Sequence, residues 1–275
     1  MAKHIPGPLY FQQQGTVGVP MLFLHSTPDD HRLWLFQTAK FSSWFRTIAV
    51  DLAGYGRSSA PQAGVTIADQ AEACWETVDR IAGGSPVIIH GNSMGSMIAK
   101  HMVQQRTDRV LALIVSGTGY LPSRESMVRW KQRYQSEGLD LRYKQCLDHF
   151  SPPAQARKLV QYYAEMVNDL NNIATVSSII AMNEALAMPD SEDLYRSIKV
   201  PTLIISGSAD RNHASAQELQ SHIKDAEFRV VEGAGHAVMQ EEPWTYDTYC
   251  IEFLHKHGLF PATAGSRSGH TGDQR

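Results

Sequence analysis

Short apolar segments alternate with longer segments of helical periodicity along most of this chain. The short segments are rich in β-branched residues and bounded by turn residues, which is typical of buried strands. Strands that alternate with helices pair in parallel through crossover connections, so the sequence predicts an α/β fold with a mostly parallel sheet. The predicted strands cover residues 21–24, 47–50, 87–89, 111–115, 202–205 and 228–231. The predicted helices cover residues 67–81, 96–105, 214–223 and 246–255.

Two further expectations concern strand pairing. Residues 9–12 and a strand just before Met21 could form a hairpin through a turn at residues 15–18. The main predicted strands are short and apolar, which favours positions away from the exposed edges of the sheet.

The pattern changes between Tyr120 and Ile198, where helical segments such as residues 127–135 and 154–167 follow one another without a convincing strand. Residues 202–231 alone could not bury a core, so the parts before and after this segment belong together. The sequence therefore predicts one α/β core of residues 1–119 and 199–261, interrupted by a helical cap of residues 120–198. Residues 262–275 are rich in Gly, Ser and Thr and are expected to form a disordered tail.

Composition limits the classes of protein to consider. Apolar residues make up 43% of the 275 residues and charged residues 19%, which is typical of a globular protein. The net charge of −3 includes no long block of one sign, which argues against binding to nucleic acid or to a membrane surface. The three cysteines lack metal-ligand and disulfide spacing. We expect a cytoplasmic monomer or homodimer that binds a small molecule and uses no metal or cofactor.

The strongest local motif is Gly-Asn-Ser-Met-Gly at residues 91–95, directly after a predicted strand and directly before a predicted helix. A G-x-S-x-G motif in this context is typical of a nucleophile elbow. The sharp turn strains the serine backbone, and the glycines remove side chains that would block the turn. A glycine-rich turn with a capping serine would match the motif alone, but the strand and helix around it favour Ser93 as a nucleophile.

A second motif, residues 25–28 (His-Ser-Thr-Pro), ends an earlier predicted strand. Acyl transfer needs two N–H donors for the tetrahedral oxyanion, and the elbow provides one from Met94. Thr27 is well placed to provide the second. We interpret His25 as a loop brace rather than a base, and Asp29 and Asp30 as helix-capping residues rather than a catalytic pair.

The acid and base of a triad should follow later strands in the order serine, acid, histidine. Asp210 follows the strand at residues 202–205, and His236 follows the strand at residues 228–231 in a loop of small residues. The strand at residues 111–115 is followed by no carboxylate, which strengthens the choice of Asp210. His213 is the nearest rival to His236, but its position favours an exposed residue at the start of a helix.

Together these motifs resemble the α/β-hydrolase superfamily over about residues 9–260. The resemblance implies an eight-stranded, mostly parallel sheet with helices on both faces, a helical cap over the active site, and an oxyanion hole formed by the Thr27 and Met94 amides. It is carried by residues 25–28, 91–95, 207–210 and 235–236 and by the glycine-rich turn at residues 51–58, to which we assign a structural role.

Within the superfamily, a serine at position 93 argues against haloalkane dehalogenases and epoxide hydrolases, which carry Asp there. The chain is similar to 3-oxoadipate enol-lactonases and small carboxylesterases, which implies hydrolysis of an ester or lactone of a small, partly apolar substrate through an acyl-enzyme. The elbow also resembles that of meta-cleavage-product C–C hydrolases, although many of these carry Trp where this chain has Ala237. A non-hydrolytic ligand receptor and a cofactor-free oxygenase on the same fold are the remaining alternatives.

The substrate pocket is expected to draw on the motifs and on aromatic and methionine residues of the cap. The candidates are His25, Ser26, Trp34, Trp130, Tyr134, Met182 and Ala237.

Overall fold

The computed structural model describes residues 4–120, 124–168, 175–188 and 190–261, so the predicted tail lies outside the described residues. The strands are β1 (Phe11–Gln14), β2 (Pro20–Leu24), β3 (Arg46–Val50), β4 (Val87–Asn92), β5 (Val110–Ser116), β6 (Thr202–Gly207) and β7 (Glu227–Val231). The α-helices are α1 (Leu35–Phe41), α2 (Ile67–Ala82), α3 (Met94–Gln105), α4 (Arg124–Glu137), α5 (Leu141–Leu147), α6 (Pro152–Gln155), α7 (Lys158–Val167), α8 (Val176–Leu186), α9 (Glu192–Ser197), α10 (His213–His222), α11 (Val238–Glu241) and α12 (Pro243–Lys256). Short 3₁₀ helices are η1 (His31–Trp34), η2 (Thr107–Arg109) and η3 (Gly138–Asp140).

The strands form one sheet in the order β1-β3-β2-β4-β5-β6-β7. Every pairing from β3 to β7 is parallel, and only β1 runs antiparallel to its neighbour. The predicted α/β class is therefore confirmed. The described residues form seven strands, where the resemblance implied eight.

Side chains that alternate along the central strands enter two separate cores. In β2, Leu22 and Leu24 pack with residues of α2 and α3 on one face, whereas Met21 and Phe23 pack with residues of α1 and α12 on the other. Because successive strand residues point to opposite faces, a strand buried on both faces must be continuously apolar. This explains why the central strands could be found from short apolar runs.

The predicted hairpin before β2 is wrong. β1 pairs with β3, with Phe11 opposite Val50, instead of with β2. The connection between β1 and β2 passes close to the segment that precedes β3: a Cβ on Gly15 would lie 2.5 Å from the carbonyl oxygen of Phe45. A Cβ on Gly18 would lie 2.2 Å from the carbonyl oxygen of Trp44 in the same segment. The glycines therefore allow a backbone crossing in place of a hairpin turn.

One expectation about sheet edges is also wrong, because β7 lies at an edge and pairs only with β6. Its residues 227, 228 and 230 are only half-buried, and Arg229 is exposed. The polar residues Glu227 and Arg229 alternate with apolar ones in this strand, which suits an edge position that is partly exposed to water.

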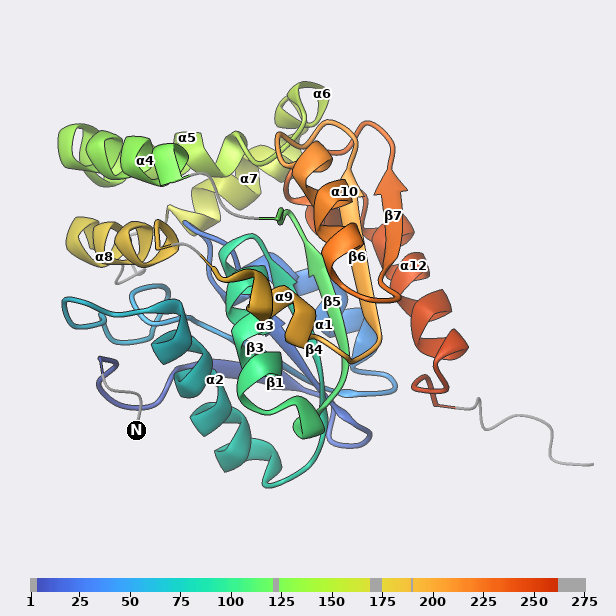
Figure 1. Cartoon of the computed structure of the whole chain (residues 1–275). Helices are drawn as coiled ribbons and strands as arrows, with labels where there is room; N and C mark the ends of the chain where they lie inside the picture. Colours follow the sequence, from blue (N-terminus) through green and yellow to red (C-terminus); the bar gives the residue numbers. More distant parts are fainter. Residues whose placement is uncertain (1–3, 121–123, 169–174, 189, 262–275) are drawn as a thin grey trace, which may run out of the picture.

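Helices α4 to α9 lie between β5 and β6 in the sequence, and the described residues of this segment contain no strand. Figure 1 shows α4, α5, α6 and α7 above the end of the sheet toward which the arrowheads of β5 and β7 point. The helix predicted over residues 154–167 is divided into α6 and α7, because Arg157 between them has an extended backbone. The division of the chain into core and cap stays a prediction; we refer to α4–α9 as the inserted helices.

Candidate active site

The turn from β4 into α3 forces Ser93 into an uncommon backbone conformation. β4 ends at Asn92 and α3 begins at Met94, so Ser93 alone makes the turn, with φ 53° and ψ −114°. A positive φ is strained for a residue with a side chain and persists only where its surroundings enforce it. A Cβ on Gly91 would lie 2.5 Å from the carbonyl oxygen of Gly95, and a Cβ on Gly95 would lie 2.1 Å from the carbonyl oxygen of Leu24. Glycine at both positions is what permits the turn.

Asp210 and His236 lie next to each other although they follow different strands. His236 Nδ1 lies 3.0 and 3.1 Å from the two carboxylate oxygens of Asp210, and both side chains are buried. The amide of Asn212 also donates to Asp210 Oδ1 over 2.9 Å. Burial alone raises the pKa of the Asp210 carboxyl, but His236 and the Asn212 amide outweigh burial and hold that pKa below its ordinary value.

This pairing defines the chemistry of the other ring nitrogen. With a carboxylate acceptor at Nδ1, the neutral His236 ring carries its proton on Nδ1 and leaves a lone pair on Nε2. His236 Nε2 is buried and has no hydrogen-bond partner among the described residues. Nε2 is therefore positioned to accept a proton from a group in the cavity.

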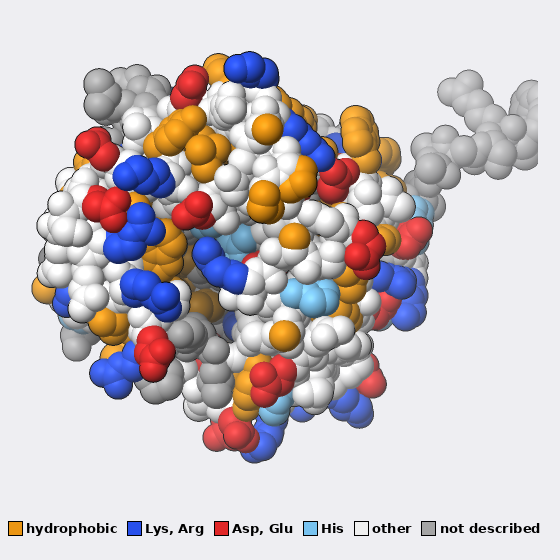
Figure 2. Space-filling view, turned by 90° about the horizontal axis from the view of Figure 1, so that it is seen from above, with side chains coloured by type: hydrophobic (Ala, Val, Ile, Leu, Met, Phe, Trp, Pro, Cys, Tyr) orange, Lys and Arg blue, Asp and Glu red, His pale blue; other side chains and the backbone are white. Residues whose placement is uncertain are grey.

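Ser93 and His236 line the same cavity, which has a volume of about 300 Å³. That volume lies at the lower end of the range for small-molecule sites. Figure 2 shows a hollow near the middle of the face seen from the side of the inserted helices, with a basic side chain at its rim. The cavity is lined by Thr27, Ser93, Met94, Met97, Gly117, Thr118, Gly119, Ser126, Met127, Trp130, Gln145, His149, Asn183, Leu186, Arg211, Asn212, Ser215 and His236.

The predicted oxyanion donors, Thr27 and Met94, line this cavity as well. Met94 is the first residue of α3, where backbone amides lack an acceptor in their own helix and the helix dipole favours negative charge. The Thr27 side chain accepts a hydrogen bond from Tyr55 over 2.9 Å, and its carbonyl accepts one from Gln145 over 3.4 Å. These contacts fix the loop that carries the Thr27 amide.

The expected set of pocket residues needs correction. Of the seven candidates, Trp130 on α4 is the one that lines this cavity within the described part of the chain. The others occupy packed or hydrogen-bonded positions elsewhere: His25, Ser26, Trp34, Tyr134, Met182 and Ala237.

Two of these candidates, His25 and Trp34, hold parts of the core and its loops in place. His25 Nδ1 lies 2.8 Å from the carbonyl oxygen of Ser26, and its Nε2 accepts a hydrogen bond from the Leu52 amide over 2.9 Å. His25 therefore braces the loop. Trp34 is fully buried in the core against Phe23 and Tyr246.

Contacts with polar neighbours explain the remaining positions. The Tyr134 hydroxyl donates to Gln145, and the Met182 sulfur accepts from Gln70. Ser26 donates to Asp29, and the Ala237 amide donates to the carbonyl of His149. The sequence pattern does not show which way the side chains of Tyr134 and Met182 point from their helices.

The rival histidine and the second carboxylate also have defined positions. His213 is the first residue of α10, as predicted, but it is half-buried instead of exposed, because its Nδ1 lies 3.1 Å from the Ser206 hydroxyl. Asp30 is the N-cap of η1, as predicted. Asp29, in contrast, is fully buried and faces His149.

Sequence reasoning missed several cavity residues, of which His149 is the most relevant to chemistry. It lies in a short connection between α5 and α6 that shows no periodicity and carries no motif. Only its histidine side chain could have drawn attention to it. The other missed polar and apolar residues of the cavity wall include Met97, Met127, Gln145, Asn183, Leu186, Arg211 and Asn212.

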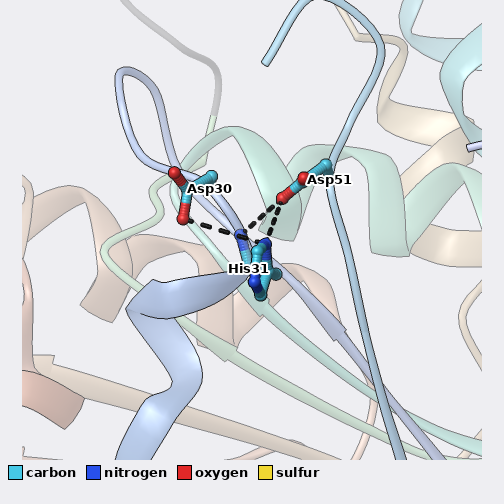
Figure 3. Close-up of side chains that lie close together, drawn as sticks. All are labelled: Asp30, His31 and Asp51. Carbon is cyan, nitrogen blue, oxygen red and sulfur yellow. Dashed lines mark hydrogen bonds and ion pairs between the residues drawn. The ribbon is translucent and has the colours of Figure 1, made fainter. Parts of the chain in front are cut away.

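Asp30, His31 and Asp51 lie close enough together to suggest a metal site (Figure 3). However, Asp51 Oδ1 accepts hydrogen bonds from the amide and ring of His31 over 2.8 and 2.7 Å, and Oδ2 accepts one from the Arg57 amide. Asp30 forms an ion pair with Arg32 at 2.6 Å. The carboxylates are thus used to brace the loop after β3, which fits the structural role assigned to this motif.

The comparison with protein families decides the wider assignment. A model described as the alpha/beta hydrolase family matches residues 21–245. The chain belongs to the alpha/beta hydrolase family. This match includes Ser93, Asp210 and His236, and it supports a hydrolase as the protein's general class.

Curated relatives of this alpha/beta hydrolase are distant. The AB hydrolase superfamily protein YisY of Bacillus subtilis is 27% identical and covers 86% of this chain and 91% of its own. The (E)-2-((N-methylformamido)methylene)succinate hydrolase of Acinetobacter baylyi is 24% identical. The match covers 85% of this chain and 89% of that protein.

Solved structures show the same fold. An esterase from Thermogutta terrifontis is 25% identical with a TM-score of 0.80, covering 90% of this chain and 93% of its own. The enol-lactonase of Burkholderia xenovorans has a TM-score of 0.80 at 22% identity. The match covers 90% of this chain and 96% of the enol-lactonase. Within the described residues of this alpha/beta hydrolase, no helix combines the length and apolar character needed to cross a membrane. The oligomeric state and the cytoplasmic location stay predictions.

Proposed function

We propose that this alpha/beta hydrolase is a serine hydrolase that cleaves a carboxylic ester or lactone of a small, partly apolar substrate through an acyl-enzyme. The observation that carries this proposal is the buried His236 ring, which lines the same cavity as Ser93. Asp210 contacts its Nδ1, and its Nε2 has no hydrogen-bond partner in the described part of the chain. Serine becomes a nucleophile only when an adjacent base takes its proton, and this ring is suited to that role.

In the proposed mechanism, His236 Nε2 takes the hydroxyl proton as Ser93 Oγ attacks the substrate carbonyl. The amides of Thr27 and Met94 stabilise the tetrahedral oxyanion. Collapse breaks the bond to the leaving alkoxide, which receives the proton from His236, and leaves an acyl-serine. Water then attacks the acyl-serine with His236 again as base, which releases the carboxylic acid and restores the serine.

The cavity wall supports a small, partly apolar substrate. Met97 and Met127 and the ring of Trp130 provide apolar surface, while Asn183 and Asn212 add polar groups. The esterase and enol-lactonase that share the fold make ester and lactone hydrolysis the first activities to test.

The experiment measures kcat and KM for 4-nitrophenyl esters of increasing acyl length, beside an enol-lactone and a vinylogous β-diketone. We expect activity on short or medium esters or on the lactone, and a loss in kcat on the order of 10⁴ or more for Ser93→Ala, as in other triads. Ser208→Ala, which changes an exposed serine, serves as the control. Undiminished esterase activity in Ser93→Ala would refute the proposal, and cleavage of the β-diketone alone would replace ester by carbon–carbon hydrolysis.

A further inference from the structure

A second histidine lies beside the proposed base. His149 is buried, lines the same cavity as Ser93 and His236, and comes from the connection between α5 and α6. The centroids of the His149 and His236 rings lie 4.9 Å apart, with their planes inclined by 49°. The inserted helices thus bring an additional imidazole to the proposed reaction centre.

Backbone contacts hold this histidine in place. The Ala237 amide donates to the His149 carbonyl over 2.8 Å. The Glu241 carboxylate accepts from the amides of Ser151 and Gly235, both over 3.0 Å, so it joins the two loops. A Cβ on Gly235 would lie 2.7 Å from the Ser151 nitrogen, which shows how closely the backbones pack. The position of His149 relative to His236 is therefore set by the fold.

A buried carboxylate lies beside the His149 ring. Asp29 Oδ2 lies 3.6 Å from His149 Nδ1 and also accepts from the Ser26 hydroxyl, while Oδ1 accepts from the Tyr163 hydroxyl over 2.9 Å. Burial raises the pKa of Asp29, but His149 and the two hydroxyls outweigh it and lower that pKa, so the group is a carboxylate at neutral pH.

Burial favours the neutral form of this ring. Burial lowers the pKa of His149; Asp29 opposes this effect, and the nearby His236 and Arg211 add to it. A neutral ring with a carboxylate at Nδ1 carries its proton there and keeps a lone pair on Nε2. His149 lines the cavity, and Asn183 Nδ2 in the same cavity wall is buried without a hydrogen-bond partner among the described residues.

We propose that His149, held beside His236 in the cavity, binds a hydroxyl group of the substrate close to the scissile bond, so that the enzyme prefers hydroxylated esters over their unsubstituted counterparts. An unprotonated ring nitrogen accepts a hydrogen bond from a hydroxyl group, whereas a plain acyl chain offers it no donor. Sites built to bind a polar group reject analogues without it for this reason. This inference rests on the proposed function.

The test compares kcat/KM for two matched pairs of esters. In 4-nitrophenyl 3-hydroxybutyrate and 4-nitrophenyl butyrate, the hydroxyl lies on the acyl side. In 2-hydroxyethyl butyrate and propyl butyrate, it lies on the leaving-group side. We expect the wild type to prefer the hydroxylated member of one pair about tenfold, which is the value of one hydrogen bond.

The variants separate recognition from folding. His149→Phe should bring this ratio of kcat/KM values close to one, because Phe keeps an aromatic ring and removes the acceptor. His149→Gln should restore part of the ratio, since its side-chain oxygen can accept a hydrogen bond. Tyr162→Phe is the control: it makes the same kind of change at an exposed tyrosine of α7 outside the cavity wall, and should leave the ratio unchanged.

Two results would overturn the inference. One is a wild type without a hydroxyl preference in either pair, which requires no variant. The other is a His149→Phe variant that keeps the wild-type preference. An equal loss of kcat/KM on both members of a pair counts as this result, because it leaves their ratio unchanged. If Ser93 is nevertheless acylated in these experiments, the proposed function stands and only the role of His149 fails.

Discussion

A buried lysine behind the proposed nucleophile provides a quantitative test of the structure. Lys100 lies on α3, is fully buried, and its Nζ has no hydrogen-bond partner among the described residues. The ammonium lies 4.8 Å from the centroid of the Tyr195 ring. Burial lowers the pKa of Lys100 from 10.5 to about 8, against the opposing charge of Asp190. Both Asp190 oxygens are already occupied, by His101 and Tyr195.

The sign and size of the effect follow from this pKa. Because the folded-state pKa lies below the unfolded one, the unfolded state binds the proton more tightly, and the charged lysine destabilises the fold at neutral pH. A shift from 10.5 to about 8 corresponds to about 3 kcal/mol at pH 7. Stability recovers as the pH rises from about 8 to 10.5. At pH 9.5 the destabilisation by Lys100 is therefore about 2 kcal/mol smaller than at pH 7.

We therefore predict that Lys100→Met, a change of similar volume, raises the free energy of unfolding by about 3 kcal/mol at pH 7 and by clearly less at pH 9.5. Urea unfolding of both proteins at the two pH values measures this difference. Lys224→Met, which changes an exposed lysine, should have little effect at either pH. A gain that does not change with pH, or a loss at both values, would refute the reasoning about the buried charge.

Two further predictions concern the elbow and the acid. Gly95→Ala should destabilise the protein by about 3 kcal/mol or prevent folding, because the added Cβ would lie 2.1 Å from a backbone oxygen of β2. Gly84→Ala is the control, because a Cβ there meets nothing within 4 Å, and it should be neutral in the same urea unfolding assay. Asp210→Asn should lower kcat on the order of 10⁴ with a small change in KM, since the amide permits the wrong tautomer of His236. Glu232→Gln, in the same loop as His236, is the matched control, and equal kcat values for both variants would exclude Asp210 as the orienting acid.

The sequence predicted well those features that depend on local chemistry. The central strands were visible because burial on both faces requires continuous apolar residues. The turn at Ser93 was visible because it needs glycine on each side, and the structure shows the close backbone contacts that impose this need. Asp210 and His236 could be chosen because both follow parallel strands, whose carboxyl ends share one edge of the sheet.

Features that depend on long-range packing were not predictable in this way. The pairing of β1 with β3 is decided by a backbone crossing, which periodicity does not reveal. The pocket residues depend on how each inserted helix turns about its axis: Trp130 faces the cavity, whereas Tyr134, one turn later on α4, is buried against Gln145. His149 lies in an irregular connection, so only the fold brings it next to His236.

The central claim is that Ser93 forms the acyl-enzyme. The most direct measurement is intact mass spectrometry of the wild type and Ser93→Ala after incubation with a fluorophosphonate, followed by peptide mapping. The account predicts one adduct on the wild type, located at Ser93, and none on Ser93→Ala. An adduct at another residue, or equal labelling of both proteins, would contradict it.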